Sequence, residues 1–222
     1  MKKIFLGIIC LLFCQISFSQ NTAFQDEWSA GVNAGVTLSK MRFTPSRPQD
    51  MLQQGSGGIV IRYISENHFG IQAELNYSLR GWKERTDTVI NLNQYSRSLA
   101  YLELPVMTHL YFNLGKRARL IFNVGPQIGF NIGEKELERV INTTPEQTEE
   151  SFGYYDLKVQ RAFDYGIAMG GGLEIRTGIG YFILEGRYYF GLADVFSNTR
   201  SDFFQSSAHQ VIGVKLTYLL KR

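Results

Sequence analysis

The feature that most constrains this chain is a strict alternation of apolar residues with small or polar residues. In residues 28–39 every even-numbered position from Trp28 to Leu38 is apolar, and every odd-numbered position is Ser, Gly, Asn or Thr. Successive side chains of a β-strand point to opposite faces, so this pattern predicts a strand with one apolar and one polar face. The pattern recurs and predicts eight strands, near residues 28–39, 57–65, 69–80, 102–112, 120–131, 163–176, 182–190 and 211–218.

The connections between these strands alternate in length. Short turns are expected at residues 66–67, 113–117 and 177–178, whereas long polar loops are expected near residues 40–56, 81–97, 132–161 and 191–207. Antiparallel up-and-down barrels of outer membranes have this asymmetry, with short turns on one rim and long loops on the other. Strands of roughly 9–14 residues are also long enough to cross a bilayer, which requires about 9–11. The pattern therefore predicts an all-β, eight-stranded transmembrane barrel.

The composition excludes two other classes of protein. The mean hydropathy of −0.13 is too low for a bundle of membrane helices. The 23 Lys and Arg residues nearly balance the 20 Asp and Glu residues, so the chain lacks the basic surface of a nucleic-acid-binding protein.

The first nineteen residues have the pattern of a cleaved signal peptide. Lys2 and Lys3 precede an apolar stretch that reaches Ile16, and small residues follow at Ser17 and Ser19. We expect residues 1–19 to be the signal peptide and residues 20–222 to form one barrel domain. Both cysteines lie within residues 1–19, so the mature chain is expected to have no disulfide and no thiol chemistry.

The alternation does not by itself say which face of the barrel is inside. A soluble barrel would bury the apolar face, whereas a membrane barrel would turn it toward lipid. The polar face carries five basic and five acidic residues among many Gly, Ser and Asn, a balance that a water-facing surface does not need. Aromatic residues such as Trp28, Phe69 and Tyr218 lie toward the ends of the apolar face, as in the aromatic belts of membrane barrels. These observations favour the membrane barrel.

The residues expected in the lumen are ten charged residues and one histidine. The interior of an eight-stranded barrel is filled by side chains, so buried charges must pair there. We expect a closed barrel in which this cluster has a structural role; a small channel that uses the cluster as a conduction path or proton relay is the alternative. The cluster consists of Arg62, Glu74, Arg80, Glu103, His109, Asp164, Glu174, Arg176, Glu185, Arg187 and Lys215.

The sequence has little that predicts catalysis. His68, His109 and His209 lack the spacing of metal ligands. His109 beside Glu103 could orient a serine nucleophile, as in an outer-membrane lipid hydrolase, but the Gly-x-Ser-x-Gly motif is absent. The Gly170–Gly172 run lies inside a predicted strand, which favours relief of crowding over a phosphate-binding loop. We therefore expect a protein that is not an enzyme and that has no cofactor or metal.

The predicted loop 132–161 is strongly charged. It carries seven acidic and four basic residues, a net charge of −3. Such a loop is either a contact surface for an external partner or divalent ions, or a solvated connection.

Several segments are similar to one known family. They are residues 31–41 (GVNAGVTLSKM), 69–77 (FGIQAELNY), 101–105 (YLELP) and 185–188 (EGRY). Strand by strand, the chain resembles the PorT-like outer-membrane β-barrel family of Bacteroidetes. The resemblance implies an outer-membrane barrel of a Gram-negative bacterium with no known enzymatic activity. The resemblance is not extended to a role in secretion. We expect contact with outer-membrane lipid, contacts with other envelope or secretion proteins through the external loops, and a monomer.

Overall fold

The fold is described from a computed structural model, which covers residues 26–85, 94–140, 155–197 and 204–221. The predicted signal peptide, residues 1–19, lies outside the described residues, as do both cysteines.

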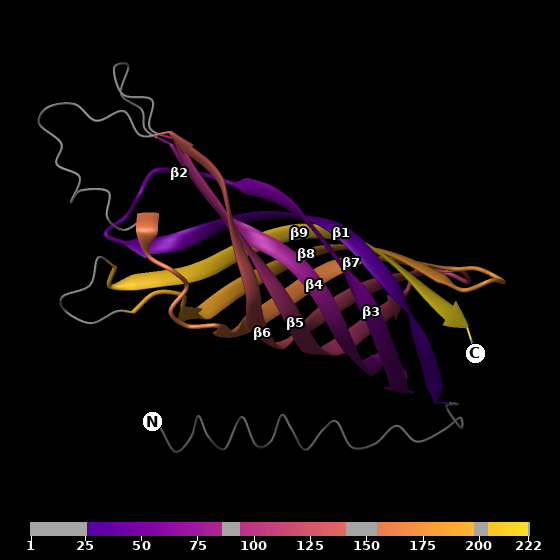
Figure 1. Cartoon of the computed structure of the whole chain (residues 1–222). Helices are drawn as coiled ribbons and strands as arrows, with labels where there is room; N and C mark the ends of the chain where they lie inside the picture. The colour runs from indigo at the N-terminus through magenta and orange to yellow at the C-terminus, as the bar shows by residue number, and fades with distance from the viewer. Residues whose placement is uncertain (1–25, 86–93, 141–154, 198–203, 222) are drawn as a thin grey trace, which may run out of the picture.

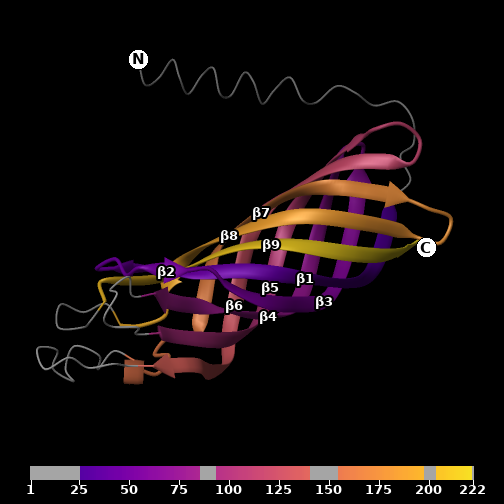
Figure 2. The same cartoon turned by 90° about the horizontal axis from the view of Figure 1, so that it is seen from above.

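The described residues form nine strands and one closed ring. Eight long strands pair with their neighbours in the order β4-β3-β1-β9-β8-β7-β6-β5, and the β4–β5 pairing closes the barrel. All pairings between these strands are antiparallel, and Figures 1 and 2 show the strands tilted around a common axis. The predicted eight-stranded antiparallel barrel is thus confirmed. The strands are β1 (Glu27–Thr44), β2 (Gln49–Asp50), β3 (Leu52–Glu66), β4 (Phe69–Arg85), β5 (Gln94–Asn113), β6 (Ala118–Val140), β7 (Phe163–Arg176), β8 (Tyr181–Asp194) and β9 (Ser206–Lys221).

The strands extend further at one end than the alternation predicts. The expected long loops are too long, because each range includes several residues that belong to the flanking strands in the structure. These ranges are 40–56, 81–97, 132–161 and 191–207. Ladder hydrogen bonds continue past the apolar band, where both faces of a strand can be wet and the period of two is lost. The expected short turns are correct to within two or three residues. We call the end with these turns the turn end, and the other the outer end.

The apolar face points outward and the polar face points into the barrel. On the apolar face, Val32 is 56% exposed and Leu216 is 57% exposed, whereas Arg62 and Glu174 on the polar face are 0% exposed. The soluble-barrel alternative is wrong, because it requires the reverse arrangement. Large apolar side chains exposed in a continuous band need lipid rather than water around them.

No helix in the described part of the chain is long and apolar enough to cross a membrane.

Glycines allow the strands to approach closely at several lumen positions. A Cβ atom added to Gly31 would lie 1.8 Å from the carbonyl oxygen of Tyr218, and one added to Gly172 would lie 2.0 Å from that of Leu184. The Gly170–Gly172 run is therefore part of the wall of β7, where it relieves crowding against β8.

Candidate functional site in the barrel lumen

The turn end of the lumen is closed by one carboxylate between two arginines. Glu174 on β7 forms an ion pair with Arg62 on β3, and its Oε1 lies 3.3 Å from Nη1 of Arg119 on β6. The guanidinium carbon of Arg119 lies 4.2 Å from the ring centre of Tyr111. Buried aliphatic side chains, including Ile121, pack in the same layer. We call this layer the turn-side plug.

Glu74 on β4 is the centre of the middle layer. Its two oxygens accept hydrogen bonds from both Nη atoms of Arg187 at 2.7 Å and from Nζ of Lys215 at 2.6 Å. Gln72 and Asn76 donate two further hydrogen bonds at 2.8 Å. A carboxylate with this many charge-assisted hydrogen bonds is held as the anion and in one orientation.

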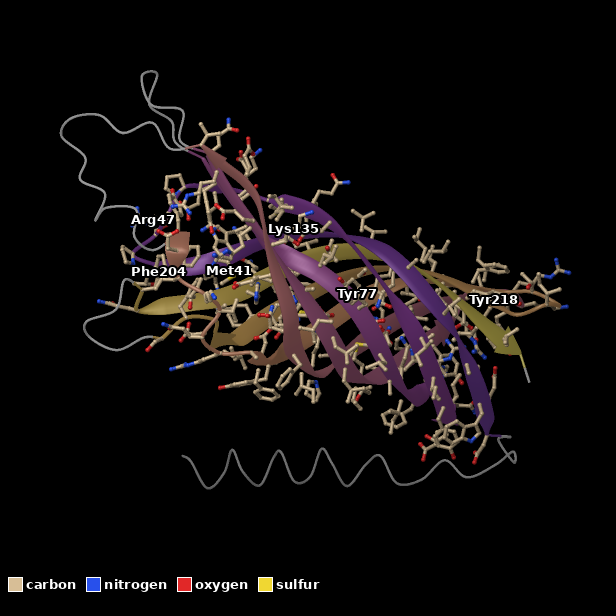
Figure 3. The ribbon with its side chains drawn as sticks, in the orientation of Figure 1. Met41, Arg47, Tyr77, Lys135, Phe204 and Tyr218 are labelled. Atoms are coloured by element: carbon tan, nitrogen blue, oxygen red, sulfur yellow. The ribbon has the colours of Figure 1, made fainter. Side chains whose placement is uncertain are left out.

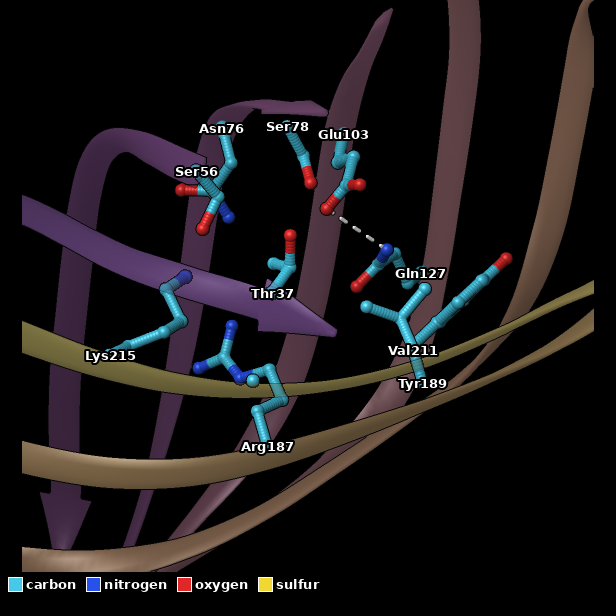
Figure 4. A pocket seen from close by; sticks show the side chains of 11 residues that line it. Thr37, Ser56, Asn76, Ser78, Glu103, Gln127, Arg187, Tyr189, Val211 and Lys215 are labelled. Carbon is cyan, nitrogen blue, oxygen red and sulfur yellow. Dashed lines mark hydrogen bonds between the residues drawn. The ribbon is translucent and has the colours of Figure 1, made fainter. Parts of the chain in front are cut away.

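Arg187 extends the middle layer to a second carboxylate. Its Nη2 lies 2.9 Å from Oε2 of Glu185, which is on the same strand. Beside Arg187 is a cavity of about 40 Å3, lined by polar side chains that include Thr37, Ser78 and Gln127 (Figure 4). Because a buried water needs roughly 10–15 Å3, this cavity has room for only a few water molecules.

The next layer toward the outer end places one arginine between two acids. Nη2 of Arg80 lies 2.9 Å from Oε1 of Glu103, and its Nη1 lies 2.7 Å from Oδ2 of Asp164. The Tyr189 hydroxyl donates to Asp164 at 2.9 Å. The guanidinium carbon of Arg80 lies 4.2 Å from the ring centre of Tyr101. Burial is tolerated here because each charge has an opposite charge and hydrogen bonds.

Aromatic side chains close the outer end of the lumen. Tyr95 and Tyr155 stack with ring centres 4.1 Å apart, and Phe43 and Phe204 stack at 4.4 Å. We call this cluster the outer cap, and Figure 3 shows Phe204 and Met41 at this end and Tyr218 at the other. Its members are Met41, Phe43, Trp82, Tyr95, Leu99, Tyr101, Tyr155, Val195, Phe196 and Phe204.

Segments between strands contribute to the outer cap and are held by polar contacts. The Tyr155 hydroxyl donates to Oε2 of Glu84 at 3.1 Å, and Nε1 of Trp82 donates to Oε1 of the same carboxylate at 3.2 Å. The Arg97 guanidinium donates to the carbonyl oxygens of Tyr155 and Leu157. The cap therefore depends on residues 155–157, which belong to no strand.

One pair outside the membrane-spanning segments has a perturbed acid. Nη1 of Arg139 donates to Oδ1 of Asp156 at 2.7 Å, and this hydrogen bond lowers the pKa of Asp156. This contact also ties residues 155–157 to the outer part of β6.

The structure buries ten of the eleven residues expected in the lumen. Arg176 is the exception: it is half buried at the end of β7, with its guanidinium carbon 5.4 Å from the ring centre of Tyr181. The sequence reasoning missed Arg119, which fills the role expected of a fifth buried base. Arg119 has an odd residue number, like the lumen residues Ile121 and Asn123. A predicted strand that began at residue 118 instead of 120 would have included it among the lumen residues.

The lipid-hydrolase alternative needs His109 beside Glu103, but the two side chains have different partners. Nδ1 of His109 lies 2.7 Å from Oδ1 of Asn123, while Glu103 contacts Arg80 and Gln127. The two residues are six positions apart on β5, about 20 Å along the strand. Within the described ranges no three His, Cys, Asp or Glu residues come together as a possible metal site.

Comparisons with known proteins agree with this architecture. Residues 18–197 match the sequence model of a family described as outer membrane protein beta-barrel domain. No curated protein matches the chain in sequence. Among solved structures, Neisserial surface protein A is similar with a TM-score of 0.50 and 8% identity, over 90% of this chain and 100% of that one.

Two further solved structures show lower similarity. The outer membrane protein OprG from Pseudomonas aeruginosa matches with a TM-score of 0.48 and 9% identity, over 89% of this chain and 96% of that one. The attachment invasion locus protein Ail of Yersinia pestis matches with a TM-score of 0.40 and 11% identity, over 87% of this chain and 99% of that one.

Proposed function

Since the chain belongs to the outer membrane protein beta-barrel domain family, we propose that it is a closed, non-catalytic barrel that acts structurally or through the parts of its strands and loops beyond the outer leaflet. That the protein is a β-barrel of the Gram-negative outer membrane follows from its family and fold. We further propose that it is a monomeric, PorT-like member from Bacteroidetes, is exported by the signal peptide of residues 1–19, and contacts other envelope proteins only through its outer end.

The observation that carries this proposal is that side chains close the lumen at four successive levels. The turn-side plug, the Glu74 layer, the Arg80 layer and the outer cap follow one another along the axis. In the three charged layers each basic residue contacts a carboxylate, so an ion crossing the lumen would have to displace paired charges from one another; these residues are Arg62, Arg119, Arg80, Arg187 and Lys215. Breaking such a pair in a low-dielectric interior costs several kcal/mol.

The proposal excludes a steady conductance, and planar-bilayer recording tests this. We expect the parent protein to give no single-channel steps. Its folding is checked beforehand by the difference in gel mobility between boiled and unboiled samples. A general porin inserted in the same bilayer is the control for detection. Regular steps from the parent protein would overturn the closed-barrel proposal and favour the channel.

The absence of catalysis needs a separate test. We expect no release of acyl chains when the folded protein is incubated with labelled outer-membrane lipid. Support comes from His109, which lies near the asparagine Asn123 rather than an acid. Release that disappears in a His109→Ala variant would contradict the proposal and favour a lipid hydrolase.

A further inference from the structure

The outward face of β1 changes from apolar to basic at one point. From Trp28 to Leu38 the outward residues are apolar, and the next two are Lys40 and Arg42. Ten residues of tilted strand span about 25 Å of membrane thickness, which is the height of the apolar band of such barrels. Lys40 and Arg42 therefore lie at the headgroup level, on the side of the outer end.

Arg42 is held against the wall of the barrel. Its Nη2 donates to the carbonyl oxygen of Gly191 on β8 at 2.7 Å, and its guanidinium carbon lies 4.0 Å from the ring centre of Phe190. Because β9 lies between β1 and β8, the Arg42 side chain crosses one strand to make these contacts. The long side chain is thus ordered before any ligand arrives, which lowers the entropy cost of binding.

Neither cation is neutralised within the part of the chain that the structure describes. Lys40 and Arg42 have no carboxylate at ion-pair distance there, and Nε of Arg42 is buried without a hydrogen-bond partner. The acid nearest in the ladder, Asp194, accepts hydrogen bonds from the Ser206 hydroxyl and the Ser207 amide instead. An ordered, unpaired cation beside the headgroup layer is suited to an anionic group of the lipid.

A groove on the lipid-facing wall lies on β7, β8 and β9, nearer the turn end than these cations. It has a volume of about 650 Å3. Its floor contains Gly171 and Gly186, which are opposite one another on β7 and β8. At the outer end of the groove are Tyr188 and Ile212. The missing side chains leave a hollow in a face that is otherwise covered by large apolar residues.

The groove and the cations are connected through the sheet register. Gln210, the next outward residue of β9 after Ile212, is the ladder partner of Lys40. Its Nε2 donates to the hydroxyl of Tyr188 at 2.7 Å. A single molecule with a negatively charged head and an acyl chain can therefore touch both features at once.

We propose that the outer wall formed by β1, β7, β8 and β9 binds one phosphorylated lipid of the outer leaflet. A phosphate group lies against Lys40 and Arg42, and one acyl chain occupies the groove over Gly171 and Gly186. This site is outside the barrel and is independent of whether the lumen conducts.

The test titrates folded protein in detergent micelles with bisphosphorylated lipid A and measures binding by native mass spectrometry. We expect the double variant Lys40→Gln, Arg42→Gln to bind roughly thirtyfold more weakly, because each of the two cations near an anionic headgroup contributes a factor of about five. Lys135→Gln, which removes an exposed lysine of β6, is the matched control and is expected to bind as the parent does. Folding of each variant is checked by the boiled and unboiled mobilities.

Two further arms separate the sources of binding. Gly186→Leu fills the groove and is expected to weaken both phosphorylated and dephosphorylated lipid A. Gly55→Leu is its control, since a Cβ at Gly186 or at Gly55 meets only a backbone oxygen, at 3.9 Å in each case. Equal binding by the parent and the double variant would overturn the proposal. So would competition by inorganic phosphate at the same concentration as the lipid, which indicates an anion site rather than a lipid site.

Discussion

The two closures of the lumen differ in where their residues come from. The turn-side plug consists of residues on strands, with Arg62, Arg119 and Glu174 on β3, β6 and β7. The outer cap includes Tyr155, Phe196 and Phe204, which lie between strands. The register of the barrel therefore positions the plug, whereas the cap also requires the connecting segments to be in place. The turn end is expected to be as stable as the barrel, and the outer end can open locally.

The largest effect is expected from removing the acid of the turn-side plug. Glu174→Ala leaves Arg62 and Arg119 buried without a carboxylate, which should lower the free energy of unfolding by about 3–5 kcal/mol. Urea titration of the protein in lipid vesicles, followed by tryptophan fluorescence, measures this. The conservative control Glu174→Gln retains a hydrogen-bond acceptor and should lose less. A loss below about 1 kcal/mol for Glu174→Ala would show that water reaches the two arginines.

A smaller and local effect is expected from the outer cap. Tyr155→Ala removes a stacked ring and the hydrogen bond to Glu84, together worth about 1–2 kcal/mol. The consequence should be faster proteolysis near residues 155–161, with the urea midpoint of the barrel nearly unchanged. Tyr155→Phe retains the ring and loses only the hydroxyl, so its rate of proteolysis should lie between those of the parent protein and of Tyr155→Ala. If Tyr155→Ala shifts the midpoint as much as Glu174→Ala does, the two closures are not independent.

The smallest expected effect is a pH dependence in the stability of residues 155–161 at the outer end. The Arg139 hydrogen bond lowers the pKa of Asp156, so this contact stabilises the folded segment at pH values above the ordinary pKa of an aspartic acid. The contribution is lost as the pH falls through the lowered pKa. Hydrogen exchange of residues 155–161 should therefore accelerate, after correction for intrinsic rates, when the pH is taken below about 4. Asp156→Asn should remove this pH dependence; if it does not, another group controls the segment.

Much of the fold could be predicted from residue parity, because a strand between lipid and a packed lumen must alternate at every position. Parity also identified ten lumen residues. Parity failed at the ends of strands, where side chains no longer face either lipid or a packed lumen. Arg176 lies at the end of β7, where a side chain can turn toward solvent. Arg119 lies before residue 120, at which the predicted strand begins. Parity could not predict Tyr155 or Phe204 in the cap, because these aromatic residues follow no repeat and their burial depends on how distant segments fold back.

The position of Glu74 has a consequence for how the barrel is assembled. Its two cationic partners, Arg187 and Lys215, are 113 and 141 residues later in the chain, on the last two strands. A barrel that entered the membrane one strand at a time from its N-terminus would carry this carboxylate unpaired in lipid until the end. Because that intermediate is so unfavourable, insertion and closure of the ring are expected to occur together, after all eight strands have been delivered.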